Sequence, residues 1–223
     1  MLSKLLGNRW ILGVSGAIAL LITPLNMSPL ATAATEIDTN ISLSPLEPLD
    51  AANQFFTFRD EPINPRAVGD LLPWLSDTEP GPIALDVEGS LADTNRYWAE
   101  VSVVEDGPAA GTVTATWNPW LGDNTTYTTG YRWLGQLDNG LHILRVAKNT
   151  GGSGVFTSLL FIRFSMDTEY ANGPGPRQRL VMTRMGSQGL GDRDGRAVRL
   201  EGNHVVIEPG NNFETVRIDL TDY

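Results

Sequence analysis

The feature that most constrains the fold is a two-residue period of apolar side chains, which begins near residue 83 and recurs to the end of the chain. In the first such segment Ile83, Leu85 and Val87 fall on one side of an extended chain, and more polar residues fall on the other. This alternation is typical of β-strands with one buried face. Further segments with strand character span residues 97–104, 112–117, 127–134, 141–147, 155–166, 179–185, 197–200, 204–207 and 213–220. Turn residues (Gly, Pro, Asn and Asp) separate them, so we expect a mostly antiparallel all-β protein.

The expected architecture is a two-sheet sandwich of jelly-roll type, with a closed β-barrel as the alternative. One short helix is expected, because Asn64 is placed to cap it, Pro65 suits its first turn and Pro73 ends it. Apolar residues occupy both faces of the segment 155–166, which predicts a central strand covered on both sides. No repeat and no long linker is evident, so we expect a single domain over residues 55–223.

The sharpest local signal is the pair Asn139-Gly140, which favours a two-residue type I′ turn between two strands. In that register Leu137 faces His142 across the hairpin. One face of the hairpin would then carry Tyr131, Trp133, Leu137, Leu144 and Val146. We expect this face to lie in the core.

The first 33 residues have the order of a secretory signal peptide. Lys4 and Arg9 precede an uncharged run over residues 10–22, and small residues follow before the expected cleavage site. The run is short of the roughly 20 apolar residues needed for a membrane-spanning helix. Residues 34–54 show no helix or strand period and are expected to form an extended leader. Because the chain has no cysteine and therefore no disulfide, we expect a bacterial exported protein, secreted or periplasmic.

The chain is acidic, with a formal net charge of −10 at pH 7. Phosphate backbones and anionic lipids would repel such a chain, so we expect no nucleic-acid partner. Positive charge gathers in residues 177–199, which hold six arginines and two aspartates. Arg177, Arg179 and Arg184 are therefore candidates for binding an acidic polysaccharide or lipopolysaccharide. The alternative is that they neutralise acidic strands of the same fold or of a neighbouring subunit.

Composition excludes several kinds of catalysis. Thiol chemistry needs cysteine, and no G-x-S-x-G motif occurs. His142 and His204 lie 62 positions apart, without the close spacing of zinc ligands, and we expect both to be ordinary surface or hydrogen-bonded residues. Asp86 and Glu88 lie two apart on a predicted strand, which would project both carboxylates to one face about 6.6 Å apart. That spacing suits the acid and the nucleophile or base of a glycosidase, and it is also the pattern of a solvated strand face.

A calcium site is a further alternative for one turn of the chain. Asp192 and Asp194 precede Gly195, and Glu201 is a candidate third ligand. Calcium takes about six to eight oxygen ligands, and the motif lacks the remaining acids of an EF-hand loop. Nearby arginines would also repel the ion. We therefore expect a solvated hairpin turn and no cofactor.

The last candidates are aromatic. Trp117 and Trp120 flank a turn, and Tyr127 lies across the following loop. Flat rings with one polar edge stack on sugars and anchor protein interfaces, although they also pack in cores. We expect an exported soluble β-sandwich that acts as a non-catalytic envelope or extracellular binding module for glycans or partner proteins. The alternatives are a polysaccharide-active glycosidase that uses the carboxylate pair and a structural envelope component that assembles with itself.

Overall fold

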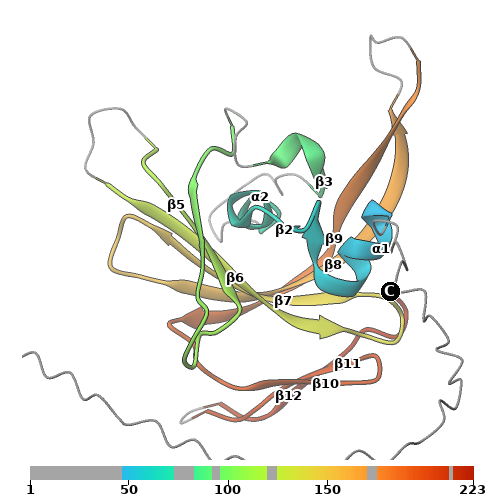
Figure 1. Cartoon of the computed structure of the whole chain (residues 1–223). Helices are drawn as coiled ribbons and strands as arrows, with labels where there is room; N and C mark the ends of the chain where they lie inside the picture. The colour runs from blue at the N-terminus through green and yellow to red at the C-terminus, as the bar shows by residue number, and fades with distance from the viewer. Residues whose placement is uncertain (1–46, 73–82, 92–95, 120–124, 170–174, 211–212) are drawn as a thin grey trace, which may run out of the picture. The chain divides into compact units, whose positions relative to one another are not determined.

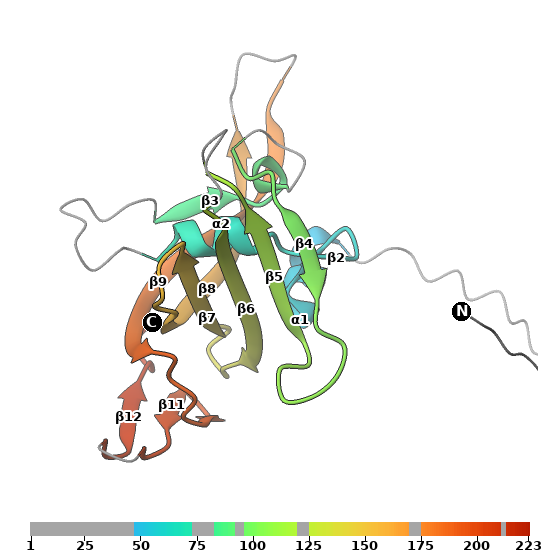
Figure 2. The same ribbon diagram turned by 90° about the vertical axis from the view of Figure 1, so that its left-hand side faces the viewer.

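The computed structural model describes residues 47–72, 83–91, 96–119, 125–169, 175–210 and 213–223. Its largest element is an antiparallel sheet of seven strands, which curls around short N-terminal elements (Figures 1 and 2). In the order in which they lie side by side, the strands are β3 (Ala84–Asp86), β9 (Arg177–Asp192), β8 (Phe156–Glu169), β7 (His142–Thr150), β6 (Tyr127–Gln136), β5 (Thr112–Trp117) and β4 (Glu100–Val103). Strands β3 and β4 form the two edges, so the sheet is open.

A second, smaller antiparallel sheet forms from the last part of the chain. Its strands, in order, are β10 (Val198–Glu201), β11 (His204–Ile207) and β12 (Val216–Asp219). It packs against the outer face of the large sheet and lies below it in Figure 1. The apolar side chains buried in this outer core are Leu137, Leu141, Ile143, Leu159, Phe161, Leu190, Val205, Ile207 and Leu220. Their burial joins the two sheets into a sandwich.

The inner face of the large sheet is covered by the N-terminal elements (Figure 1). These are α1 (Pro48–Phe55), β1 (Thr57–Phe58), β2 (Glu61–Pro62), α2 (Pro65–Asp70) and the 3₁₀ turn η1 (Glu88–Ser90). The inner core contains Ala52, Phe56, Phe58, Ile63, Val68, Leu71, Val87, Val113, Tyr131, Leu144, Val146, Leu160, Ile162, Phe164, Leu180 and Met182. Each fully buried leucine in this core contributes about 1.5–3 kcal/mol of transfer free energy. The large sheet is therefore covered on both faces.

The side chain of Asn64 determines where helix α2 begins. Its Oδ1 accepts a hydrogen bond from the backbone N–H of Arg66 at 3.0 Å, and Pro65 occupies the first position of the helix. Its Nδ2 donates to the carbonyls of Ser90 and Tyr97 at 3.0 and 2.9 Å. One buried asparagine thus caps the helix and ties it to two later segments. The short helix expected here is confirmed.

Helix α1 corrects the expectation of an extended leader over residues 34–54, whose last part it occupies. Pro48 takes the first turn of the helix, where its missing N–H costs nothing. Ala52 and Phe56 bury their side chains in the inner core. This packing stabilises the helix. The sequence of the segment shows no helical period that would have predicted it. Neither this helix nor any other among the described residues is long and apolar enough to cross a membrane.

The expected all-β, mostly antiparallel sandwich is confirmed, and every predicted strand from residue 83 onward overlaps an observed strand. Strand β8 is buried from both sides, as its apolar pattern predicts: Leu160 and Ile162 lie in the inner core, and Leu159 and Phe161 lie in the outer core. The connectivity is simpler than that of a jelly roll. Strands β4 to β9 lie side by side in chain order as a meander, because each strand turns back directly onto its neighbour.

The β6–β7 hairpin has a different register from the predicted one. The backbone N–H of Leu137 donates to the carbonyl of Leu141 at 2.8 Å, so the loop contains three residues instead of two. Within it Gly140 has a positive φ of 84°, which matches the three-residue hairpin class with a left-handed last position. Leu137 therefore enters the outer core and not the predicted face. A bulge after Trp133 then shifts the pairing, so that Trp133 lies opposite Leu144 beside the inner core.

Candidate functional site

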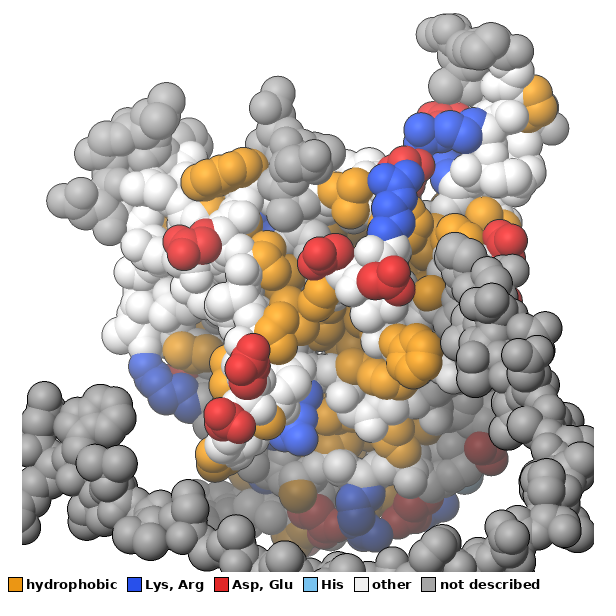
Figure 3. Space-filling view, viewed as in Figure 1, with side chains coloured by type: hydrophobic (Ala, Val, Ile, Leu, Met, Phe, Trp, Pro, Cys, Tyr) orange, Lys and Arg blue, Asp and Glu red, His pale blue; other side chains and the backbone are white. Residues whose placement is uncertain are grey.

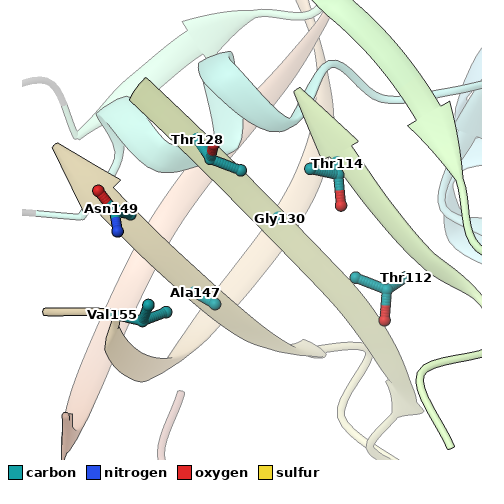
Figure 4. A pocket seen from close by; sticks show the side chains of 7 residues that line it. All are labelled: Thr112, Thr114, Thr128, Gly130, Ala147, Asn149 and Val155. Atoms are coloured by element: carbon teal, nitrogen blue, oxygen red, sulfur yellow. The ribbon is translucent and has the colours of Figure 1, made fainter. Parts of the chain in front are cut away.

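A shallow groove lies on the outer face of the large sheet, across strands β5, β6 and β7 (Figure 4). Its volume is about 330 Å³. The side chains that line it are Thr112, Thr114, Thr128, Gly130, Ala147, Asn149 and Val155. We call this feature the threonine groove.

The groove exists because of two small residues on neighbouring strands. Gly130 lies opposite Thr114 on β5 and opposite Ala147 on β7, so all three share one face of the sheet. A Cβ atom at Gly130 would approach the Thr114 hydroxyl to 3.2 Å, so a glycine there keeps the floor low. The smaller sheet packs on other outward residues, including Ile143 and Leu159, and these lie outside the groove.

The groove is lined by hydroxyl groups that make no side-chain hydrogen bond to any residue that the structure describes. Among the described residues, no side-chain hydrogen bond engages the hydroxyls of Thr112, Thr114 or Thr128. Asn149 is different, because its Oδ1 accepts from the N–H of Gly151 at 2.7 Å and its Nδ2 donates to the carbonyl of Gly152 at 3.1 Å. Each threonine hydroxyl can donate one hydrogen bond and accept two. The groove therefore offers several unused polar groups to a ligand.

Two arginines lie where the groove continues into an adjoining cavity of about 210 Å³. Its lining shares Thr112, Gly130 and Ala147 with the groove and adds Arg132 and Arg145. We call this region the arginine end. Burial lowers the pKa of Arg145, Asp194 opposes that shift, and the charge of Arg132 adds to it.

The predicted aromatic residues lie on the other face of the sheet. Trp117 and Tyr127 pair directly across β5 and β6, with their ring centroids 5.9 Å apart in an edge-to-face arrangement. The guanidinium of Arg66 lies 4.8 Å from the centroid of the Trp117 ring. Because side chains alternate along a strand, this pair faces away from the threonine groove. Trp120 lies outside the described residues.

Trp98, which was not a candidate from the sequence, is the most exposed tryptophan among the described residues. It is 60% exposed, and its carbonyl accepts a hydrogen bond from Arg66 Nη1 at 2.8 Å. Arg66 thus links it to Trp117. Tyr97, the residue before it, is buried, so the two neighbouring side chains differ sharply in exposure.

Two sets of predicted residues meet in one ion-pair cluster. Arg177 lies 3.5 Å from a carboxylate oxygen of Asp86 and 3.7 Å from one of Glu88. The two acids do not share a strand as predicted: Asp86 ends β3, whereas Glu88 begins η1, and Asp86 Oδ1 accepts from the N–H of Glu88 at 3.0 Å. The same oxygen accepts from the N–H of Gly89 at 3.2 Å, so the Asp86 side chain stabilises the turn into η1. Each carboxylate is therefore engaged by a guanidinium and serves a structural contact.

The same cluster extends along the paired ends of β8 and β9. Arg177 lies 3.6 Å from Glu169, and Arg179 lies 2.8 Å from Asp167. The hydrogen bond from Arg179 lowers the pKa of the Asp167 carboxyl. Figure 3 shows basic and acidic side chains next to each other on this projecting hairpin. Arg184 contacts a different part of the fold, because its Nη1 donates to the carbonyl of Leu71 at 2.8 Å.

The structure does not bring the three candidate calcium ligands together. Asp192 pairs with Arg193, Asp194 pairs with Arg196 at 2.7 Å, and Glu201 pairs with arginines of the smaller sheet. Within the described ranges no group of three or more His, Asp or Glu side chains is arranged to hold a metal ion. The arginines that were expected to oppose the ion are bound to these carboxylates.

The threonine groove was not predicted, because threonine, glycine and alanine form no recognised chemical motif. The available signal was the run Thr112, Thr114 and Thr116, which places three hydroxyls on one face of a strand. Comparison with protein-family models, with curated proteins and with solved structures found no match.

Proposed function

We propose that this protein is an exported, non-catalytic binding module that holds a glycan in the threonine groove. The observation that carries the proposal is that the hydroxyls of Thr112, Thr114 and Thr128, above a floor of Gly130 and Ala147, have no hydrogen-bond partner in the described part of the chain. A sugar presents hydroxyls that both donate and accept hydrogen bonds, so it complements such a surface. The low floor lets a ring approach the backbone of the sheet.

Two further observations support a binding role over a catalytic one. The candidate catalytic acids Asp86 and Glu88 are held by Arg177, and they lie on strands and turns at the β3 edge, whereas the groove lies on β5 to β7. No titratable carboxylate lines the groove among the described residues. Hydrolysis of a glycosidic bond requires a pair of carboxylates at the bound sugar. The lining of the groove therefore favours binding of a glycan over its hydrolysis.

The first test compares glycan binding of isosteric variants. Thr114→Val keeps the shape and the β-branching of the side chain but removes the hydroxyl that faces Gly130. Loss of one hydrogen bond of about 0.5–1.5 kcal/mol should weaken binding about twofold to twelvefold. The matched control is Thr116→Val, which changes the next outward threonine of the same strand and does not line the groove. The assay is retention on a glycan array followed by titration calorimetry.

Three results would contradict the proposal. The first is an absence of retention on every envelope and extracellular polysaccharide. The second is an equal effect of Thr114→Val and Thr116→Val on affinity. The third is release of reducing ends from a bound polysaccharide, which would favour the glycosidase alternative. Trp120→Ala, tested beside them, decides whether the predicted aromatic contact belongs to the same site.

Export is a separate part of the proposal, supported by the order of charge and apolar residues over positions 1–33. Mass spectrometry of the protein from the culture medium or the periplasm should find a mature chain that begins just after Ala33 or Ala34. An uncut chain in the cytosol would contradict it.

A further inference from the structure

Two arginines face each other directly across neighbouring strands at the arginine end. Arg132 on β6 and Arg145 on β7 are register partners, which places both side chains on the outer face of the sheet. Like charges directly opposite each other destabilise a sheet. An anion bound between two such guanidiniums would remove this repulsion.

The protein supplies too little negative charge near Arg132 and Arg145 to neutralise both guanidiniums. Arg145 lies 3.9 Å from Asp194 and donates to the carbonyl of Arg196, but Asp194 also pairs with Arg196 at 2.7 Å. Arg132 donates to the carbonyl of Pro108 at 3.3 Å, and no carboxylate lies within 4 Å of its guanidinium among the described residues. Asp194 thus pairs with two of these three guanidiniums, and Arg132 has no paired carboxylate among the described residues.

This surplus is unusual within the chain. The protein has a net charge of −10, and the exposed arginines Arg177, Arg199 and Arg217 on the sheets each pair with a carboxylate. Arg177 contacts three carboxylates, and Arg179 contacts two. Positive charge is left uncompensated where the floor of the threonine groove continues into the adjoining cavity.

We infer that the ligand of the threonine groove is an acidic glycan, whose carboxylate lies between Arg132 and Arg145 while its hydroxyls contact the threonines. The inference rests on the proposed function and names the class of sugar that the groove takes. A guanidinium binds a planar carboxylate through two parallel N–H donors, which fixes its orientation. In a uronic acid the carboxylate is attached to a ring carbon. The same sugar unit carries the hydroxyls that would contact Thr112 and Thr114.

The test uses oligogalacturonate and its fully methyl-esterified counterpart, in which a methyl group on each carboxyl removes the negative charge. The wild-type chain should bind the acid about tenfold more tightly than the ester at low salt, and added NaCl should reduce that ratio. Arg132→Gln should lower affinity for the acid to that for the ester and leave binding of the ester unchanged. The matched control is Arg217→Gln, which removes one positive charge on the exposed face of the smaller sheet. Urea unfolding of each variant confirms that it folds.

The outcomes separate the inference from the proposed function. Equal binding of acid and ester by the wild-type chain, with no effect of Arg132→Gln, would overturn the acidic ligand and leave glycan binding intact. Equal losses in Arg132→Gln and Arg217→Gln would show a general charge effect and would also overturn it. A preference for a sulfated glycan such as heparin over oligogalacturonate would overturn the assignment to a carboxylate. An absence of binding to any glycan would overturn both proposals.

Discussion

Acidification should unfold this protein in part through one buried histidine. His142 is 0% exposed, and its ring lies among those of Phe56, Trp133 and Phe164, with centroids 5.7, 6.1 and 5.2 Å away. Its Nε2 lies 3.3 Å from Asn53 Oδ1, and among the described residues no carboxylate pairs with the ring. Burial therefore lowers the pKa of His142 from 6.5 to about 4.

The sign and size of the effect follow from this pKa. Above about pH 6.5 the histidine is neutral in both the folded and the unfolded chain, so it does not alter stability. Below that pH His142 binds a proton in the unfolded chain but stays neutral in the folded chain, where its pKa is lower. The free energy of unfolding should then fall by about 2 kcal/mol at pH 5 and by about 3 kcal/mol at pH 4. Further acidification below pH 4 adds little from this residue, because the folded protein then binds the proton as well.

The assay is urea unfolding monitored by tryptophan fluorescence, repeated between about pH 8 and pH 5. His142→Gln keeps an amide near the position of Nε2 but cannot titrate, so its stability should fall by about 2 kcal/mol less over this range than that of the wild-type chain. His204→Gln is the control, because His204 lies on the smaller sheet beside Asp219 with a partly exposed side chain. Parallel pH profiles for the wild-type chain and His142→Gln would refute the reasoning. So would an NMR titration of folded His142 with a midpoint near 6.5.

Two further substitutions test the packing of the fold. Asn64→Ala removes the cap of helix α2 and leaves the buried carbonyls of Ser90 and Tyr97 without a donor, so thermal or urea unfolding should show a loss of roughly 2–4 kcal/mol. A loss below about 0.5 kcal/mol would contradict this role. Gly140→Ala places a Cβ where the nearest atom is 4.0 Å away, so its cost should be only the left-handed backbone, about 1–2 kcal/mol. Gly152→Ala, where nothing lies within 4 Å, should be neutral by comparison, and equal effects at both glycines would contradict this explanation.

Local chemistry made the strands and the helix α2 predictable. Alternation of apolar and polar residues identifies a strand with one buried face, and Asn64 followed by Pro65 identifies a helix start, because both signals act within a few residues. The predicted loop at Asn139 shows the limit of such signals. Asn139 Nδ2 donates to the carbonyl of Leu220 at 2.7 Å, and its N–H donates to Asn203 Oδ1 at 2.9 Å. The loop therefore forms two hydrogen bonds to residues that flank strands of the smaller sheet. No signal near Asn139 in the sequence predicts them.

The same limit applies to the candidate site. Arg177, Asp86 and Glu88, all selected from the sequence, meet in one ion-pair cluster, and this outcome depends on the pairing of β3 with β9. The threonine groove depends on Gly130 lying between Thr114 and Ala147, three residues from three different strands. The sequence by itself determined which segments are strands, because side-chain alternation is a local property. Only the tertiary structure decided which of their side chains share a surface, because register and sheet order bring together residues that are distant along the chain.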